Sequence, residues 1–137
     1  MVEYLIHSKN TDGLTTLSDI LTAPILDDNT IIYAYNANNE IIGAIAINIS
    51  NIYDFKNHSI IRYGVIEYIA SRQKGVGTIL MQASEQWFRD HITEMTHTII
   101  HVISLKTSIG FYLTMGFHLC PLNENYPGLH IMQKNIV

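Results

Sequence analysis

The sequence predicts an α/β fold, in which helices lie on both faces of a mixed, mostly antiparallel sheet of six to seven strands. Segments rich in β-branched and aromatic residues alternate along the chain with segments of helical periodicity. A strand, helix, strand series at residues 60–70, 75–90 and 98–104 favours parallel neighbours joined by a right-handed crossover. An earlier hairpin signal favours antiparallel neighbours, so the sheet is expected to be mixed.

The N-terminal part of the chain predicts one helix among strands. Val2–Ser8 reads as a strand, and Leu14–Leu21 has apolar residues at a helical spacing that ends before Pro24. Thr30–Tyr35 is rich in β-branched and aromatic residues, and Ile41–Ile49 alternates between two faces. The turn signal "NANNE" separates these two strands, which predicts an antiparallel hairpin.

The rest of the chain predicts strands and helices in alternation. The strands are expected at 60–70, 98–104, 117–120 and 130–135, and the helices at 75–90 and 108–115. The first of these helices places Val76, Ile79, Leu80, Ala83 and Trp87 on one apolar face, and Trp87 and Phe88 are expected in the core. Gly116 is a natural C-cap for the second helix. Since no repeat or linker interrupts the pattern, residues 1–137 are predicted to form a single domain.

Composition restricts the function classes. A formal net charge of −4 disfavours a general nucleic-acid binder, which needs a basic surface. The sequence has no apolar run near the roughly 20 residues that span a bilayer, so no membrane partner is expected. Cys120 is the single cysteine, which excludes a disulfide within the chain and favours a reducing, cytoplasmic setting. Cys120 is interpreted as a buried hydrophobic residue, because no base is evident beside it.

The glycine-rich stretch "SRQKGVGTIL" separates a predicted strand from a predicted helix. A dinucleotide fingerprint fails because Leu80 occupies its third glycine position, and the sequence has no G-x-x-x-x-G-K-[ST] string. One remaining interpretation is an anion cradle, in which N–H groups at the helix start bind phosphate and Arg72 and Lys74 add positive charge. The other is a turn that uses glycine for a positive φ and nothing more.

The pattern R-x-x-G-x-G in "SRQKGVGTIL" and the pattern F-Y-x-x-x-G-F in "IGFYLTMGFHL" together resemble motifs of the GNAT superfamily of acyl-CoA-dependent N-acetyltransferases. The pattern R-x-x-G-x-G is formed by Arg72, Gly75 and Gly77. The pattern F-Y-x-x-x-G-F occurs in "IGFYLTMGFHL", at Phe111, Tyr112, Gly116 and Phe117. The resemblance extends over nearly the whole chain and implies direct transfer of an acetyl group from acetyl-CoA to an amine acceptor, without a metal.

The resemblance also implies a set of site residues. The acetyl-CoA-binding residues would be Tyr112 and the run of Ile69, Ala70, Ser71, Arg72, Gln73, Lys74, Gly75, Val76, Gly77 and Thr78. Backbone N–H groups near Ile69–Ser71 would stabilise the oxyanion. Tyr112 would donate a hydrogen bond to the leaving thiolate, and Glu67 would act as the base, helped by burial or by a relay through water. His101 is the rival base, because an imidazole pKa near 6.5 suits neutral pH.

Other functions stay open at this stage. A non-catalytic acyl-CoA-binding module is the main alternative, since Leu105 stands where the family often has a cofactor-contacting asparagine. The approach from Glu67 to Arg72 is also shorter than the family's usual loop. A toxin acting on charged tRNA would need a basic surface that this chain lacks. The acceptor, a small-molecule or a protein amine, is not specified by the sequence, and a homodimer is a further option.

Overall fold

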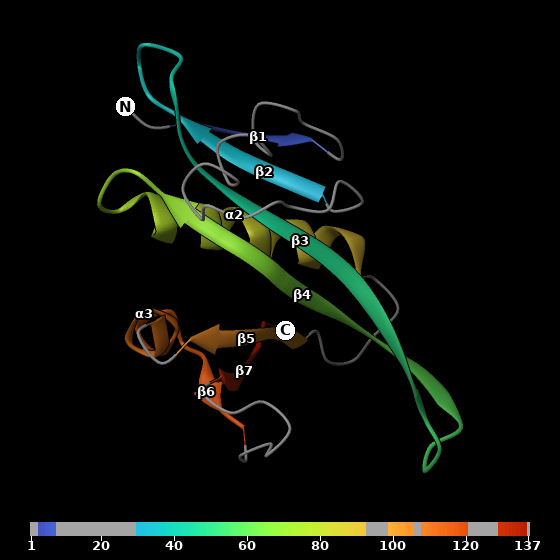
Figure 1. The fold of residues 1–137 in the computed structure, drawn as a ribbon. Coiled ribbons are helices and arrows are strands. Elements are labelled where there is room, and N and C mark those ends of the chain that lie inside the picture. Colours follow the sequence, from blue (N-terminus) through green and yellow to red (C-terminus); the bar gives the residue numbers. More distant parts are fainter. Residues whose placement is uncertain (1–2, 8–29, 93–98, 106–107, 121–128, 137) are drawn as a thin grey trace. The chain divides into compact units, whose positions relative to one another are not determined.

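The computed structural model describes residues 3–7, 30–92, 99–105, 108–120 and 129–136. The helix predicted at Leu14–Leu21 lies outside these ranges. Among them the structure has the strands β1 (Glu3–His7), β2 (Thr30–Tyr35), β3 (Ile41–Asp54), β4 (Ser59–Ser71), β5 (Ile99–Leu105), β6 (His118–Leu119) and β7 (Leu129–Asn135), and the helices α2 (Val76–His91) and α3 (Ile109–Thr114). The strands form a seven-stranded sheet in the order β1-β2-β3-β4-β5-β7-β6 (Figure 1). The predicted α/β class with a mixed, mostly antiparallel sheet is confirmed.

The chain divides into two compact units. The first comprises Met1–Asn48 and Glu67–Trp87, and the second comprises Ile49–Ile66 and Phe88–Val137. The strands β3 and β4 and the helix α2 therefore contribute residues to both units. The single domain expected from the sequence stays a prediction.

In the first unit, β1, β2 and β3 form an antiparallel meander. Thr30 pairs with Ile47 and Ile32 with Ile45, so the hairpin predicted around "NANNE" is present. The Asn36 side chain closes the turn, because its Oδ1 accepts hydrogen bonds from the N–H groups of Asn38 and Glu40. An asparagine side chain that replaces a backbone acceptor in this way is the reason that turns favour this residue.

Helix α2 packs against β3 and β4 in the first unit through a position without a side chain. A Cβ atom on Gly43 would lie 2.7 Å from Val76 Cγ1, 3.1 Å from Ala70 O and 3.2 Å from Leu80 Cδ1. Val76 and Leu80 are fully buried, so neither can move aside easily. Glycine at position 43 therefore permits the close approach of the first turn of α2 to the sheet.

We expect Gly43→Ala to destabilise the fold by about 1–3 kcal/mol, the usual cost of overpacking a well-packed core. Chemical denaturation of the two proteins measures this difference. Gly110→Ala serves as the matched control, because a Cβ there meets no atom within 4 Å. Equal stability of Gly43→Ala and the unaltered chain would show that the first turn of α2 is free to shift.

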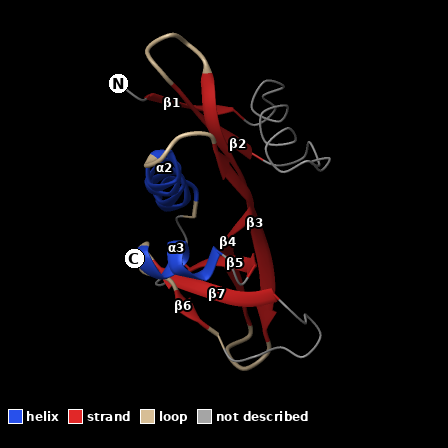
Figure 2. Cartoon of the chain, turned by 60° about the vertical axis from the view of Figure 1, so that its left-hand side comes forward, coloured by secondary structure: helices blue, strands red, loops and turns tan. Residues whose placement is uncertain are grey.

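In the second unit, the predicted parallel crossover is present. Gly64 and Val65 of β4 pair in parallel with Ile100 and His101 of β5. β5 and β6 both pair antiparallel with β7 (Figure 2). Phe88 of α2 is fully buried, and its ring lies where a Cβ on Gly64 would be, at 2.7 Å from Cε1.

The sequence was a poorer guide to the lengths and faces of two elements. β3 extends to Asp54, beyond the predicted end at Ile49, because polar residues in "NISNIYD" resemble a loop although their backbone continues in the sheet. On α2 the fully buried aromatic residue is Phe88, whereas Trp87 is only partly buried. Among the described residues, no helix is long and apolar enough to cross a membrane.

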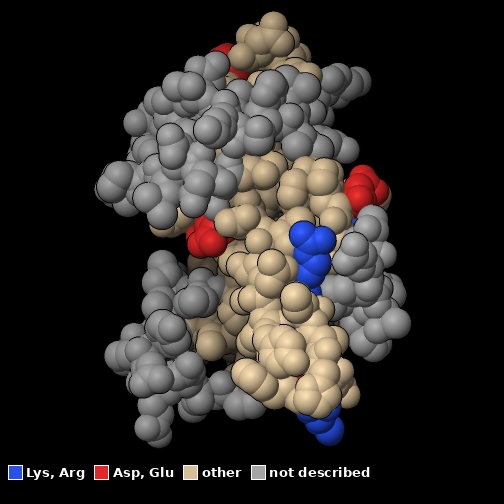
Figure 3. Space-filling view, turned by 90° about the vertical axis from the view of Figure 1, so that its right-hand side faces the viewer, with Lys and Arg blue, Asp and Glu red and all other residues tan. Residues whose placement is uncertain are grey.

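The turn between β3 and β4 exposes a group of apolar side chains. Asp54 organises this turn by accepting hydrogen bonds from the N–H groups of Lys56 and Asn57 and from the Asn57 side chain. The exposed apolar residues beside it are Ile52, Tyr53, Phe55 and Ile60. Figure 3 shows this end of the molecule as a broad uncharged surface with a basic side chain at its lower extremity. Nothing in the described structure covers these side chains.

Candidate functional site

The segment from Arg72 to Gly75 forms a tight, exposed connection between β4 and α2. The Arg72 N–H donates to Ile42 O at 2.7 Å, so the backbone pairing of β4 continues one residue past its end at Ser71. Gly75 has a φ of 88°, a conformation that L side chains rarely adopt, while the space around its Cα is open. Glycine is therefore required here for its backbone conformation and not for room.

Among the described residues, two N–H groups in the first turn of α2 have no backbone acceptor. The Val76 N–H donates to Gln73 O at 3.3 Å, and Gly75 O accepts from Ile79 at 3.4 Å. By helix geometry, the N–H groups of Gly77 and Thr78, the second and third helical residues, have no acceptor within the helix. Their combined field attracts an anion.

Charge along α2 reinforces this attraction. The first turn carries no acidic residue that would compete for the donors, and Arg89 and His91 lie in the last turn, where they favour the helix dipole. Arg72, Lys74 and the Thr78 hydroxyl are exposed around the helix start. The two interpretations of "SRQKGVGTIL" are thus compatible, because Gly75 serves the turn and Gly77 adds no side chain to the first turn of α2.

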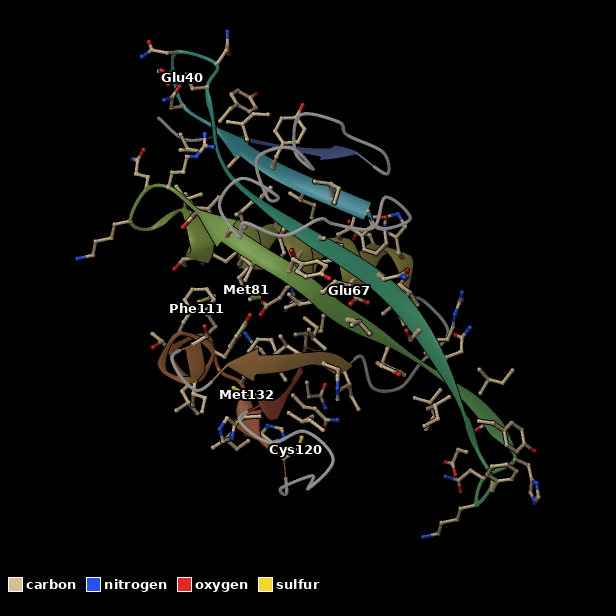
Figure 4. All side chains as sticks on the ribbon, in the orientation of Figure 1. Glu40, Glu67, Met81, Phe111, Cys120 and Met132 are labelled. Atoms are coloured by element: carbon tan, nitrogen blue, oxygen red, sulfur yellow. The ribbon has the colours of Figure 1, made fainter. Side chains whose placement is uncertain are left out.

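The end of β4 holds the other site residues predicted for this unit. Ala70 is buried in an apolar cluster with Ile31, Ala44 and Ala46, and Ser71 is exposed. Glu67 is exposed as well and lies on β4 (Figure 4), so the burial invoked to make it an effective base is not present. If Glu67 is the base, it would have to act through a water molecule. The oxyanion role of the backbone at Ile69–Ser71 stays a prediction.

In the second unit, Tyr112 belongs to a helix end with a defined geometry. Gly116 has a φ of 92° and donates its N–H to Leu113 O at 3.0 Å, while Phe117 N–H donates to Tyr112 O at 3.0 Å. These two bonds form a Schellman motif, and its usual apolar contact is made by the rings of Tyr112 and Phe117, with centroids 5.5 Å apart. The predicted glycine cap is confirmed, with Gly116 in the left-handed conformation directly after Met115, the last residue of the helix end. The F-Y-x-x-x-G-F pattern is therefore a helix cap that fixes its own tyrosine.

Burial changes the acid strength of that tyrosine. Tyr112 is 5% exposed and its ring also contacts Phe111 at a centroid distance of 5.2 Å. Burial raises the pKa of Tyr112 to about 12, because the phenolate loses its hydration. A thiol has a pKa near 8.5, so complete proton transfer from this phenol to a thiolate is uphill by about 3.5 units, or about 5 kcal/mol. Tyr112 is therefore suited to donate a hydrogen bond and stay protonated.

His101 lies on β5 in the same unit, half-buried between polar and aromatic neighbours. Burial lowers its pKa, which favours the neutral imidazole. Its Nδ1 lies 3.5 Å from Gln133 Nε2, and its ring is 6.0 Å from that of Tyr63. Sequence reasoning did not single out Gln133 or Tyr63. Both come from other strands, β7 and β4, so a register was needed to find them.

Cys120 and Leu105 are the two remaining residues that the sequence singled out. Cys120 is partly buried, and not fully as expected, and burial raises its thiol pKa. A raised pKa leaves less of the nucleophilic thiolate at neutral pH. The side chain of Leu105 lies outside the described part of the structure. Among the described residues, no group of His, Cys, Asp and Glu has the arrangement of a metal site.

The predicted site residues fall in the two units. Glu67 and the run from Ile69 to Thr78 belong to the first unit, and Tyr112 and His101 belong to the second. Within the first unit, Glu67 lies near the C-terminal end of β4, and the start of α2 follows that strand after a short connection. The roles of these residues stay predictions, and the exposure of Glu67 removes the burial expected for it.

Residues 2–117 match the family model described as the acetyltransferase (GNAT) family. The chain belongs to the GNAT acetyltransferase family. The match includes both sequence motifs and every site residue predicted above, so the resemblance stated from the sequence is confirmed. No curated protein matches the chain by sequence.

Solved structures of GNAT proteins share the fold at low sequence identity. An acyl-CoA N-acyltransferase from Pseudomonas aeruginosa is 15% identical, with 98% of this chain and 99% of that chain covered and a TM-score of 0.68. Arabidopsis thaliana NAA60 in complex with acetyl-CoA is 15% identical, with 99% of both chains covered and a TM-score of 0.70. Arabidopsis thaliana Naa50 in complex with the bisubstrate analogue CoA-Ac-MVNAL is 16% identical, with 96% and 97% covered and a TM-score of 0.66.

Proposed function

We propose that this GNAT protein transfers an acetyl group from acetyl-CoA directly to a primary amine. The observation that carries the proposal is the start of α2, which follows a turn at Gly75 and has no acidic residue in its first turn, next in sequence to the exposed Arg72 and Lys74. A helix start of this kind suits the diphosphate of coenzyme A. Family membership and the NAA60 complex with acetyl-CoA support the same ligand.

Tyr112 serves the leaving group in this proposal. The reaction forms an N–C bond to the acetyl carbon, breaks the C–S bond and leaves a thiolate that must be stabilised. The protonated Tyr112 donates a hydrogen bond to that sulfur, since its pKa of about 12 keeps the proton on the phenol. The thiolate then acquires its proton from solvent or from the amine.

Proton removal from the amine has two candidate bases. An α-amino group with a pKa near 7.7–8.0 needs only about 1 kcal/mol to be neutral at pH 7, whereas a lysine-like amine needs about 4.6 kcal/mol. Glu67 is exposed and reaches the amine through water. His101 holds a neutral imidazole because burial lowers its pKa, so it can accept a proton at neutral pH. We therefore propose His101 and Glu67 as alternative candidates for the base.

Two measurements, made one after the other, test the proposal. Acetyl-CoA at 100 times its Kd is expected to stabilise the chain by about 2.7 kcal/mol, seen as a rise in Tm, because the ligand binds the folded state. Release of free thiol is then measured with a panel of small amines and peptides with free α-amino groups. Absence of a Tm shift at millimolar acetyl-CoA would remove the proposed ligand. A shift without thiol release for any amine would favour the non-catalytic acyl-CoA-binding module.

A further inference from the structure

Lys134 reaches from β7 to the end of α3. Its Nζ donates a hydrogen bond to Met115 O at 2.7 Å, and Met115 is the C-cap residue of the helix. The same side chain lies along Gly116, where an added Cβ would be 3.2 Å from Lys134 Cε and 3.4 Å from its Nζ. The lysine thus contacts the two residues that follow the last turn containing Tyr112.

Within the described residues, helix α3 is short and weakly capped at its start. It has six residues, far fewer than an isolated helix needs to be stable. Its N-cap residue, Ser108, makes no side-chain capping bond, and neither its first nor its last turn carries a complementary charge. The Schellman motif satisfies the carbonyls of Tyr112 and Leu113, and Lys134 satisfies that of Met115. A cation at a helix C-terminus also favours the helix dipole.

The strand that carries Lys134 is a firm base for this contact. β7 is paired on both edges, with β5 from Ile99↔Asn135 to Leu105↔Leu129 and with β6 through His118 and Leu119. Lys134 itself is paired with Ile100 of β5. A strand with two neighbours moves less than an edge strand or a loop. The backbone from which the Lys134 side chain extends is therefore held in place by the sheet.

We propose that Lys134 is a positioning residue for the acetyl transfer, which holds the C-terminal end of α3 so that the Tyr112 phenol stays directed at the leaving sulfur. This inference rests on the proposed role of Tyr112. Lys134 acts through the Met115 carbonyl and the cap around Gly116, and not by contact with substrate or with the reacting atoms. The cost of losing it should appear in kcat and not in the KM for acetyl-CoA, because the helix start of α2 is untouched.

Lys134→Met tests this with a readout that does not depend on activity. Without the bond to Met115 O, the end of α3 frays and Tyr112 gains solvent, so its pKa is expected to fall from about 12 toward 10. Ultraviolet titration follows the ionisation of all tyrosines. The titration curve of Lys134→Met, less the curve of the double variant Lys134→Met with Tyr112→Phe, gives the pKa of the Tyr112 phenol alone. Burial is the cause of the raised pKa, so loss of the lysine charge alone is not expected to lower it. We expect kcat to fall by about 10-fold to 100-fold, the larger value being the cost that a misplacement of about 1 Å can have.

Matched variants complete the experiment. Lys134→Arg keeps a cationic donor and is expected to restore most of the kcat, while Lys56→Met removes an equal charge from the exposed β3–β4 turn and is expected to change neither readout. If Lys134→Met does not fold, Lys134→Leu replaces it, because leucine also lacks a hydrogen-bond donor. A Tyr112 pKa that stays at about 12 with unchanged kcat overturns the proposal. Should Tyr112→Phe alone leave kcat unchanged, the proposed role of Tyr112 fails, while the titration still decides whether Lys134 holds the helix.

Discussion

Replacement of Tyr112 by phenylalanine is expected to lower kcat for acetyl transfer about 10-fold or more, with little change in the KM for acetyl-CoA. The ring contacts with Phe111 and Phe117 survive the substitution, so the cap of α3 should remain intact. What is lost is a hydroxyl that stays protonated throughout the working pH range, because burial raises its pKa to about 12. The leaving thiolate would then lack the hydrogen-bond donor that we propose for it.

Steady-state thiol-release assays measure this effect, with Tyr53→Phe at the exposed β3–β4 turn as the control. Stability supplies a second readout. Since the folded pKa of about 12 exceeds the ordinary value of 10.0, the neutral phenol favours folding, and this contribution is complete below pH 10 and is lost as pH rises through 12. The unaltered chain should therefore lose up to about 3 kcal/mol more over this interval than Tyr112→Phe. Equal kcat values in the two proteins would exclude Tyr112 from the mechanism.

Gly77→Asp is expected to abolish acetyl-CoA binding without unfolding the chain. A carboxylate at the second helical residue of α2 lies where the proposed diphosphate binds, so it repels that ligand. The same carboxylate interacts favourably with the helix dipole, which contributes about 0.3–1 kcal/mol to stability. The variant should therefore melt no lower than the unaltered chain in the absence of ligand, and should lose the rise in Tm that acetyl-CoA produces.

The matched control is Gln82→Asp, which adds the same charge at an exposed position in the middle of α2. Its Tm is expected to rise with acetyl-CoA almost as in the unaltered chain. Isothermal titration with desulfo-coenzyme A and coenzyme A would separate binding from turnover. If Gly77→Asp and Gln82→Asp respond equally to acetyl-CoA, the start of α2 is not the diphosphate site.

Local sequence signals predicted most of the elements that position the site. The hairpin around "NANNE", the helix of Val76–His91 and the glycine cap at Gly116 each depend on neighbouring residues, and the structure contains all three. The two motifs also lie where the sequence placed them, between β4 and α2 and in α3. Turn chemistry and periodicity act over a few residues, which is why a sequence reveals them directly.

Contacts between distant segments were not predictable in the same way. Gly43 appeared to be one position in an alternating strand, yet its importance comes from Val76 and Leu80 of α2. Lys134 lies 19 residues from the carbonyl that it binds, and no pattern in "HIMQKNIV" indicates that partner. Glu67 was expected to gain basicity from burial, but the exposure of a strand residue depends on what packs over it. Such facts require the register of strands and the packing of helices.

The cap at the end of α3 explains why the three x positions of F-Y-x-x-x-G-F do not specify a residue type. Leu113 and Thr114 point to solvent, and Met115 contributes its carbonyl, so the motif constrains backbone there and not side chains. Leu113 is consequently a convenient attachment point for a spectroscopic reporter. A nitroxide or fluorophore on a cysteine introduced there, with Cys120 replaced by serine, would stand one residue from Tyr112 and record the ordering of α3 when a ligand arrives.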